Sequence, residues 1–269
     1  MQVTAIKTHK ITGDDKDLFA VLDKYLPKKL SEKSVLAITS KIVSITEGRL
    51  IKMGKVDKDE LIKQEAQFFL PRPKNPYNVS FTITRGILAA SAGIDESNAN
   101  GYYILWPKNP QRTANDVRRY LKRRFSLKNV GVIITDSKTT PMRWGVTAIA
   151  LAYSGFKSLK DYIGKKDLFG RKFQFEKLSI IDSLATSANV TMGEGSEQTP
   201  LAIISDVPFV EFQDRNPTEK ELKEIEITID IDIYGPFLKN VQWKKGSAKQ
   251  NSSAKQNSSA KQNSSAKQN

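Results

Sequence analysis

The apolar side chains of this 269-residue chain occur in short runs of strand length that are separated by polar turns. The clearest runs are SVLAITS (34–40), VGVIITDS (130–137), GVTAIALAYSG (145–155) and PLAIISDVP (200–208). None approaches the roughly 18 consecutive apolar residues that a membrane-spanning helix requires, and the N-terminus lacks the apolar stretch of a signal peptide. We therefore expect a soluble, cytoplasmic protein without a membrane partner.

Strand-like and helical patterns are interleaved along the chain. Further strands are expected at 1–11, 77–84 and 101–107. Helices are expected at 14–26, 57–69, 113–127 and 175–192. The second starts with a capping box of Asp57 and Glu60, and the start of the third is marked by Thr113 and Asp116. The inward-facing residues of the fourth are Leu178, Ile181, Leu184, Ala185 and Ala188. Because these elements do not alternate as regular βαβ units, we expect an α+β (mixed α/β) fold, with 130–137 as a central strand because both of its faces are apolar.

Residues 225–234, IEITIDIDIY, alternate strictly between apolar and polar side chains. This pattern predicts a strand with one wet face, which would carry Glu226, Asp230 and Asp232. A metal site on that face is the alternative to a solvated edge strand, and the regularity of the alternation favours the edge strand.

The chain ends in repeats of SSAKQN that start after Gly246 and contain only alanine as an apolar residue. Such a segment cannot bury enough surface to offset its ordering entropy, so we expect residues 246–269 to be a disordered appended tag and residues 1–245 to form the folded part. The four lysines of the tail lower the net charge from +14 to +10 for residues 1–245. The remaining excess of positive charge favours anionic partners.

The scarcity of two residue types excludes several classes of site. The chain has no cysteine, which removes disulfides, thiol nucleophiles and thiolate metal sites. Its single histidine, His9, has no companion ligands in KTHKIT, so we interpret it as an ordinary strand or loop residue. Neither GxxxxGK[ST] nor GxGxxG after a strand is present, which argues against a P-loop or Rossmann site.

The basic run RRYLKRR (118–124) raises the possibility of nucleic-acid binding. Tyr120 and Leu121 fit the buried face of the predicted helix, and no platform of interleaved aromatic and basic residues accompanies the run. We therefore favour a solvated helix face and expect no nucleic-acid partner.

Three separated acids stand where the backbone is expected to turn tightly. Asp95 follows Gly93 in SAGIDESN, Asp136 ends the strand VGVIITD, and Glu194 lies between two glycines. A solvated turn is the simpler interpretation of SAGIDESN taken alone. Carboxylates at strand ends and glycine turns are also well placed to converge, and such oxygen ligands suit Mg²⁺ or Mn²⁺ in phosphoryl transfer.

Successive motifs of this chain resemble those of one family. They are TSKIVSITEGR (39–49), GIDESN (93–98), VIITDS (132–137) followed by PMRWG (141–145), DYIGKKDLFGR (161–171), and MGE (192–194) followed by a proline. In this order they are similar to the motifs of the coenzyme F420-0:L-glutamate ligase family, also called γ-glutamyl ligases, over roughly residues 34–205. The resemblance implies a two-part α+β fold that forms an intertwined homodimer.

The resemblance also implies a reaction. A nucleoside triphosphate, GTP or ATP, would phosphorylate the terminal carboxylate of an acceptor, and the amine of L-glutamate would displace the phosphate to form a γ-linked amide. The acceptor would be coenzyme F420-0 or a folate, and the resemblance leaves both open. Because a carboxylate is a poor electrophile, the reaction needs metal ions, Mg²⁺ or Mn²⁺, to hold the triphosphate and offset its charge.

Matching the motifs position by position gives expected roles. Asp95, Asp136, Ser137 and Glu194 resemble metal ligands. The positions that resemble nucleotide-binding residues are Ser40, Lys41 and Asn98 together with the loop formed by Met192, Gly193, Glu194, Gly195, Ser196, Glu197, Gln198 and Thr199. Glu96, beside Asp95, matches no family role. Arg85, Arg143 and Arg171 occupy motif positions to which we assign no role.

Two departures from the family pattern affect specificity. Ile45 stands where the family commonly has a second lysine, and Lys7, Thr8, His9 and Lys10 replace a motif that is tied to guanine binding. Ile45 motivates an alternative hypothesis, a catalytically inactive protein that binds a nucleotide or a phosphorylated ligand on the same scaffold.

Overall fold

The computed structural model describes residues 1–72 and 77–248. The chain divides into two compact units, of which the first comprises Met1–Asp57 and Gly93–Val241. The second comprises Lys58–Ala92 and the segment that begins at Gln242. Helices and mixed sheets occur together, which confirms the expected α+β class.

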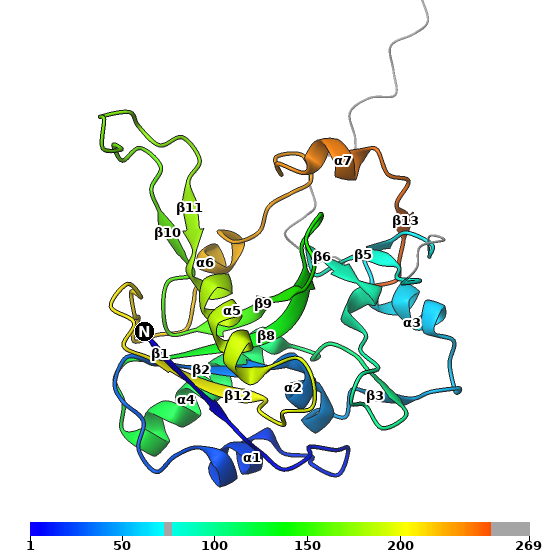
Figure 1. Ribbon diagram of the computed structural model, residues 1–269, viewed down its shortest axis with the longest axis horizontal. Coiled ribbons are helices and arrows are strands. Elements are labelled where there is room, and N and C mark those ends of the chain that lie inside the picture. Colours follow the sequence, from blue (N-terminus) through cyan, green and yellow to red (C-terminus); the bar gives the residue numbers. More distant parts are fainter. Residues whose placement is uncertain (73–76, 249–269) are drawn as a thin grey trace, which may run out of the picture. The chain divides into compact units, whose positions relative to one another are not determined.

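A five-stranded sheet organises the first unit (Figure 1). Its strands lie in the order β1 (Gln2–Ile6), β12 (Leu201–Ser205), β2 (Ser34–Thr39), β8 (Val130–Thr139) and β9 (Val146–Ser154). The pair β2–β8 is parallel and the other neighbouring pairs are antiparallel. Strand β8 lies inside the sheet, as its two apolar faces predict, although the middle position belongs to β2.

Helices cover both faces of this sheet. Helix α5 (Ile180–Met192) packs on the face that carries Val35 and Ala37. Helices α1 (Leu18–Tyr25), α2 (Ser40–Thr46) and α4 (Pro110–Phe125) contribute to the core on the face that carries Leu36 and Ile38. Successive residues of β2 therefore point into opposite cores, as a strand buried on both faces requires.

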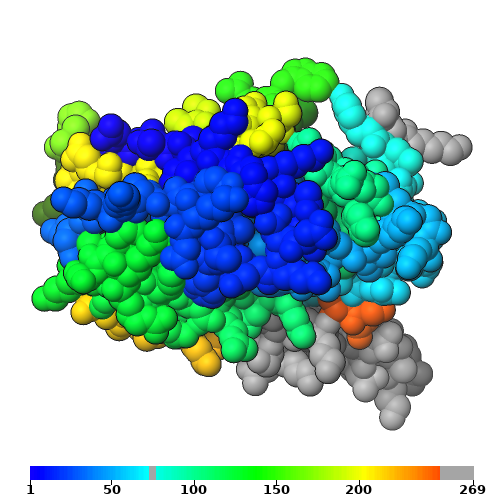
Figure 2. All heavy atoms as spheres, turned by 90° about the horizontal axis from the view of Figure 1, so that it is seen from below, coloured from blue at the N-terminus to red at the C-terminus, as the bar shows by residue number. Residues whose placement is uncertain are grey.

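Helices α1 and α4 lie side by side on their face of the sheet. Figure 2 shows the blue N-terminal segments beside the green of α4, and the rings of Phe19 and Tyr120 are 5.2 Å apart between centroids. The guanidinium of Arg124 donates to the carbonyl oxygen of Leu22 at 2.9 Å. Full burial of each apolar side chain in this layer contributes about 1.5–3 kcal/mol.

Smaller elements complete the two units. The first unit also contains β3 (Leu50–Lys52) paired with β7 (Tyr102–Ile104), the hairpin of β10 (Leu159–Asp161) and β11 (Lys177–Ser179), and the short helices α6 (Glu219–Lys223) and α7 (Gly235–Lys239). The 3-10 turn η1 (Ser91–Gly93) lies where the chain passes between the units. The second unit contains α3 (Lys58–Glu65) and a sheet in the order β13 (Lys244–Lys245), β4 (Phe68–Phe69), β5 (Phe81–Thr84) and β6 (Ile87–Ala90).

Two helix starts differ from the sequence prediction. Helix α4 begins at Pro110, and the Asn109 side chain accepts a hydrogen bond from the amide of Arg112, so the predicted start at Thr113 and Asp116 is wrong. An asparagine cap followed by proline at the first helical position is a strong start signal. Helix α5 begins only at Ile180, and Leu178, predicted to face its core, lies in β11 and is 45% exposed.

The strand predicted at 225–234 does not form. The segment turns instead, with the amides of Ile231 and Asp232 both donating to the carbonyl oxygen of Thr228. The carboxylate of Asp232 accepts from the amide of Tyr234, the local side-chain hydrogen bond that favours turns over strands. Ile231 and Ile233 are consequently 75% and 82% exposed.

The predicted disordered tail lies outside the described residues from position 249 onward. Residues 246–248 are described, and they hydrogen-bond to the second unit. The amide of Gly246 donates to Gln67, that of Ser247 to Lys63 and that of Ala248 to Ala66. The ordered part of the chain therefore extends three residues into the segment predicted to be disordered.

In the described part of the chain, no helix is both long and apolar enough to cross a membrane.

Candidate functional site

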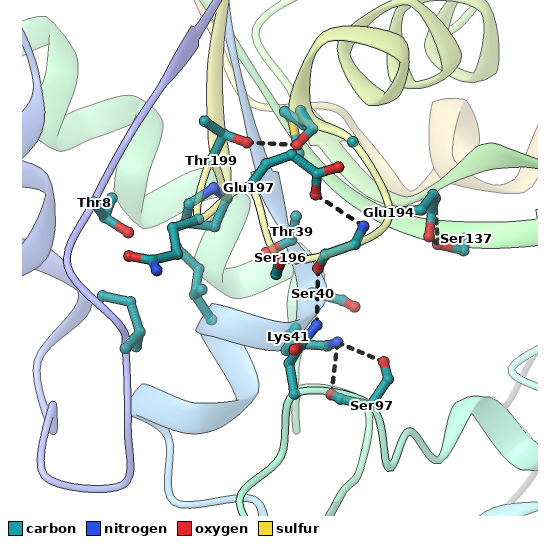
Figure 3. A pocket seen from close by; sticks show the side chains of 18 of the residues that line it. Thr8, Thr39, Ser40, Lys41, Ser97, Ser137, Glu194, Ser196, Glu197 and Thr199 are labelled. Atoms are coloured by element: carbon teal, nitrogen blue, oxygen red, sulfur yellow. Dashed lines mark hydrogen bonds between the residues drawn. The ribbon is translucent and has the colours of Figure 1, made fainter.

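A cavity of about 380 Å³ lies in the first unit, where β2 ends beside the middle of β8. Because these strands are parallel and Thr39 pairs with Thr135, the residues that follow this pair, Ser40 and Asp136, lie next to each other. The hydroxyl of Ser40 accordingly donates to Asp136 at 3.1 Å. The lining comes from five stretches of chain, within 8–11, 39–45, 95–98, 135–137 and 189–200 (Figure 3).

Asp136 enters the cavity directly after an irregularity in β8. The β8–β9 pairing shifts register between Ile134 and Thr135, and such irregularities re-aim side chains near active sites. The Oδ2 of Asp136 accepts from the indole N–H of Trp106 at 2.5 Å. Burial raises the pKa of Asp136 to about 6, against the opposing effect of the Trp106 and Ser40 donors. The site thus contains a carboxylate that lacks a full countercharge.

The backbone of Asp95 is held by an isolated antiparallel β-bridge to Ile104. Its amide and carbonyl exchange 2.9 Å hydrogen bonds with those of Ile104. Gly93 precedes it at φ +71°, and a Cβ at this position would lie 2.1 Å from Nε1 of Trp106. Trp106 therefore links both acids, because it packs on the glycine before Asp95 and donates to Asp136.

The carboxylate of Asp95 forms an ion pair with the ammonium group of Lys41. The Nζ of Lys41 lies 2.7 Å from Oδ2 of Asp95 and also donates to the carbonyl oxygen and hydroxyl of Ser97, as Figure 3 shows for the last two contacts. The amide and hydroxyl of Ser97 donate to the other oxygen, Oδ1, at 2.7 and 2.8 Å. Burial alone would raise the pKa of Asp95, but Lys41 and Ser97 outweigh it and hold the pKa below its ordinary value.

Ser137 and Glu194 form the side of the cavity opposite Thr8 in Figure 3. The hydroxyl of Ser137 lies 2.8 and 2.9 Å from the two carboxylate oxygens of Glu194. Strand β8 is thereby joined to the loop after helix α5. The prediction that Asp136 ends this strand is wrong, because the pairing with β9 continues through Ser137 to Thr139.

The loop after α5 is held in shape by its own side chains. The amide of Gly195 donates to the carboxylate of Glu197 at 2.8 Å, and the hydroxyl of Thr199 donates to the carbonyl oxygen of Met192 at 2.5 Å. Gly193 has φ +78°, and a Cβ there would lie 2.5 Å from the Glu197 carboxyl carbon. The side-chain amide of Asn98 donates to the carbonyl oxygen of Gly195 at 2.9 Å, so the loop is also tied to the turn of Asp95.

The segment after β1 closes the remaining side of the cavity. The amide of Thr8 donates to the carbonyl oxygen of Gln198 at 2.8 Å. His9 lies in this loop, as predicted, but its ring nitrogens contact the hydroxyl of Tyr25 at 2.6 Å and the carboxylate of Asp15 at 2.8 Å. Thr8 stands out in the sequence only as part of the segment that replaces the guanine-binding motif. Ser97 and Trp106 have no sequence signal, because Ser97 acts through its own turn and Trp106 through contacts with distant segments.

All predicted site residues line this one cavity, namely Ser40, Lys41, Asp95, Asn98, Asp136, Ser137 and Met192, Gly193, Glu194, Gly195, Ser196, Glu197, Gln198, Thr199. Across residues 1–72 and 77–248, however, no three His, Cys, Asp or Glu side chains are close enough together to hold a metal ion. The donor set of the Asp95 and Asp136 carboxylates and the Ser137 hydroxyl still fits Mg²⁺ or Mn²⁺, since both prefer hard oxygen ligands. The incompletely countered charge of Asp136 points the same way.

The residues left without a role lie elsewhere or are structural. Arg143 and Arg171 do not line the cavity, and Arg85 belongs to the second unit. Ile45 lines the cavity but is only 5% exposed, because it packs with Ala99 and Ile104. The departure from the family pattern at this position therefore places an apolar side chain in the core.

Cations of the basic helix α4 are largely paired within the protein. Arg118 is buried and binds Asp214, which also pairs with Lys122. Asp116 pairs with Arg112 and Arg119, and Asp23 with Arg124. The burial of Arg118 differs from the solvated position expected for this run, and the pairing reduces the charge available to a nucleic-acid backbone.

Comparison with known proteins shows the family of this chain. Residues 5–206 match the sequence model of the family described as F420-0:Gamma-glutamyl ligase. The coenzyme F420:L-glutamate ligase of Methanococcus maripaludis strain C7 is 34% identical over 238 residues, which cover 82% of this chain and 93% of that enzyme. The protein of the same name from Methanocaldococcus jannaschii is 36% identical over 197 residues, 67% of this chain and 79% of the relative. By these matches, the chain belongs to the F420-0:gamma-glutamyl ligase family.

Proposed function

We propose that this protein is a metal- and nucleoside-triphosphate-dependent γ-glutamyl ligase of the cytoplasm, where both nucleotides and glutamate are available. One observation carries the proposal. The cavity combines the carboxylates of Asp95, Asp136, Glu194 and Glu197 with a lysine and a glycine-rich loop, the groups that a triphosphate and its metal require. The relatives are named for coenzyme F420 and L-glutamate, which supports F420-0 as the acceptor, and a folate is the competing acceptor.

The proposed reaction has two steps. An oxygen of the acceptor carboxylate attacks the γ-phosphorus, the bond to the nucleoside diphosphate breaks, and an acyl phosphate forms. The glutamate amine then attacks the acyl carbon, inorganic phosphate leaves with its bonding electron pair, and the nitrogen loses a proton. The acyl phosphate supplies the leaving group that the free carboxylate lacks.

Each part of the cavity has a task in this proposal. Asp95, Asp136 and Ser137, with Glu194 behind the serine, would hold the metal, and Lys41 would bind a phosphate oxygen. Asn98 and the loop 192–199 would enclose the nucleotide, because Asn98 already fixes the backbone of Gly195. When bound, a divalent ion would neutralise charge on the triphosphate and hold it in line for transfer.

A matrix of assays tests the proposal. GTP or ATP is combined with Mg²⁺ or Mn²⁺, L-glutamate, and either the deazaflavin precursor F420-0 or a folate, and the products are identified by mass. We expect a γ-linked glutamate on one acceptor, only with metal and nucleotide present. The inactive-protein alternative, motivated by Ile45, predicts nucleotide binding without phosphate release or product in any combination.

Variants of the acids test the site within the same assay. We expect Asp95→Ala, Asp136→Ala and Glu194→Ala to abolish ligation while the circular dichroism spectrum is unchanged. Glu96→Ala is the matched control, since Glu96 is adjacent to Asp95 but does not line the cavity. Full activity in all three variants would rule out the metal-site assignment.

We also propose that the protein forms a homodimer. Several large apolar side chains of the β10–β11 hairpin are exposed, including Leu168 at 97%, Phe169 at 95% and Phe175 at 78%. Large apolar side chains exposed together on one hairpin favour an interaction site.

A further inference from the structure

The ion pair between Lys41 and Asp95 occupies the oxygen to which a divalent ion would bind. The Nζ of Lys41 is 2.7 Å from Oδ2 of Asp95, and Ser97 supplies two further acceptors at 3.0 and 3.1 Å. The Lys41 and Asp95 side chains are 28% and 39% exposed, so neither is sealed in the core. The pair is accessible to an entering ion.

We propose that Lys41 is an exchangeable counter-ion of Asp95, which a divalent metal displaces and a nucleotide phosphate then takes up. This inference rests on the proposed function, because it names how the same cavity receives its two ligands. Its consequence is positive coupling: metal and nucleotide each bind more tightly when the other is present.

The charges at the site favour this exchange. At Asp95 itself, one carboxylate faces one ammonium, that of Lys41. A divalent ion that binds the same carboxylate would meet the ammonium as a like charge at contact distance in a partly desolvated cavity, whereas moving the ammonium to a phosphate removes this repulsion. Like charges at contact distance in such surroundings repel by several kcal/mol at an effective dielectric constant of about 20.

The side chain of Lys41 suits this role. An ammonium on a flexible four-carbon stem can change partners by rotation alone, unlike a planar guanidinium fixed in a fork. Lys41 is anchored in helix α2 by its backbone, while its charged end contacts only Asp95 and Ser97 among the described side chains. Rotation toward a phosphate would therefore break no contact of the core.

The test measures Mn²⁺ binding without nucleotide, by calorimetry and by loss of the free-ion electron paramagnetic resonance signal. Lys41→Met and Lys41→Gln both remove the competing charge, and either suffices if the other folds poorly. We expect them to bind Mn²⁺ alone about tenfold more tightly than the parent protein. Lys41→Arg, which keeps the charge, is expected to retain the weak binding. Lys138→Met is the matched control, because Lys138 is exposed next to Ser137 and does not line the cavity.

The second measurement is the gain in GTP affinity on adding Mn²⁺. We expect this gain to be smaller in Lys41→Met than in the parent protein, because the lysine no longer links the two ligands. Unchanged Mn²⁺ affinity in both charge-removing variants, or an equal rise in Lys138→Met, would overturn the exchange. Failure of the parent protein to bind GTP with Mn²⁺ would instead refute the proposed function, and the effect of Lys41 on Mn²⁺ alone would still be decided.

Discussion

At the residue scale, Trp106 links the acids Asp95 and Asp136 through its contacts with Gly93 and Asp136. The indole N–H donates to Asp136, and the indole ring occupies the space where a side chain at position 93 would begin. The sequence motif GIDESN placed Asp95 correctly in a tight turn, but nothing in it indicates that the turn packs against a tryptophan. A contact of this kind depends on two segments meeting in space, so periodicity and turn chemistry do not predict it.

Gly93→Ala should therefore damage both stability and activity. A Cβ at position 93 would lie 2.1 Å from Trp106 Nε1, so the indole must shift away from Asp136. We expect a loss of about 2–4 kcal/mol of unfolding free energy from backbone strain and overpacking together, with ligation reduced at least tenfold.

Gly101→Ala is the control for that substitution. Gly101 has φ +81°, but no atom of the described residues lies within 4 Å of the added Cβ, so only the backbone cost of about 1 kcal/mol applies. Urea unfolding and ligation assays on both variants separate the two contributions. Equal losses in the two variants would show that the contact with Trp106 does not matter.

At the scale of single elements, the loop after α5 and the helix α6 each depend on one glutamate. Glu197 accepts from the amide of Gly195 and thereby shapes the loop over the cavity. Glu221 accepts from Arg215, Gln213 and Thr218 and caps helix α6. The family resemblance implies nucleotide binding for Glu197, but nothing in the sequence indicates its contact with Gly195. Thr218 and Glu221, by contrast, have the spacing typical of a capping box.

Glu197→Ala is expected to loosen the loop without weakening the fold. Among the described residues, the carboxylate contacts only its own loop, so the amides of residues 193–199 should exchange hydrogen faster while the unfolding free energy changes by less than about 0.5 kcal/mol. We expect the KM for nucleotide to rise more than kcat falls. Glu211→Ala, an exposed acid paired with Lys157, is the control, and the same exchange pattern in both variants would contradict this role.

Glu221 gives the protein a stability that depends on pH. The guanidinium of Arg215, at 2.6 and 2.8 Å from the carboxylate oxygens, holds the pKa of Glu221 well below its ordinary value of 4.5. A carboxylate with a lowered pKa stabilises the folded state above the unfolded pKa, and this contribution is lost as the pH falls below about 4.5.

Glu221→Gln should therefore lower the unfolding free energy by about 2 kcal/mol at pH 7 and by less at pH 3. Urea titrations at the two pH values measure the difference. Glu224→Gln, next to the end of α6, is the control and is expected to leave the pH dependence unchanged. A deficit in Glu221→Gln that is equally large at pH 3 would argue against the ionised carboxylate as its cause.

At the scale of the whole molecule, the sequence predicts the strands and helices that depend on neighbouring residues alone. The strands at 34–39 and 201–205 and the first part of β8, residues 130–135, follow from largely apolar runs that are buried on both faces. The family resemblance implies a two-part fold but gives no boundary between the parts, because the second unit is an insertion at 58–92 completed by a distant segment. The alternation at 225–234 failed as a predictor for the same reason, since a strand needs a neighbour that its own sequence does not specify.

The exposed hairpin leads to a prediction for the assembly. If the homodimer uses Leu168 and Phe169, the double variant Leu168→Ser, Phe169→Ser should be monomeric in light scattering after size exclusion at concentrations where the parent protein is dimeric. Val190→Ser, on helix α5 and 79% exposed, is the control for losing apolar surface. A dimeric double variant would place the interface elsewhere.

The position of β12 between β1 and β2 has a consequence for synthesis of the chain. Strand β1 leaves the ribosome first, yet both of the strands β1 and β2 must wait for residues 201–205 before they acquire their shared neighbour. The hydrogen bond from Thr8 to Gln198, which closes the cavity, waits for the same event. A nascent chain that ends before residue 201 has an open sheet edge at β2. Chaperone contact during translation should be concentrated at this edge until β12 is inserted.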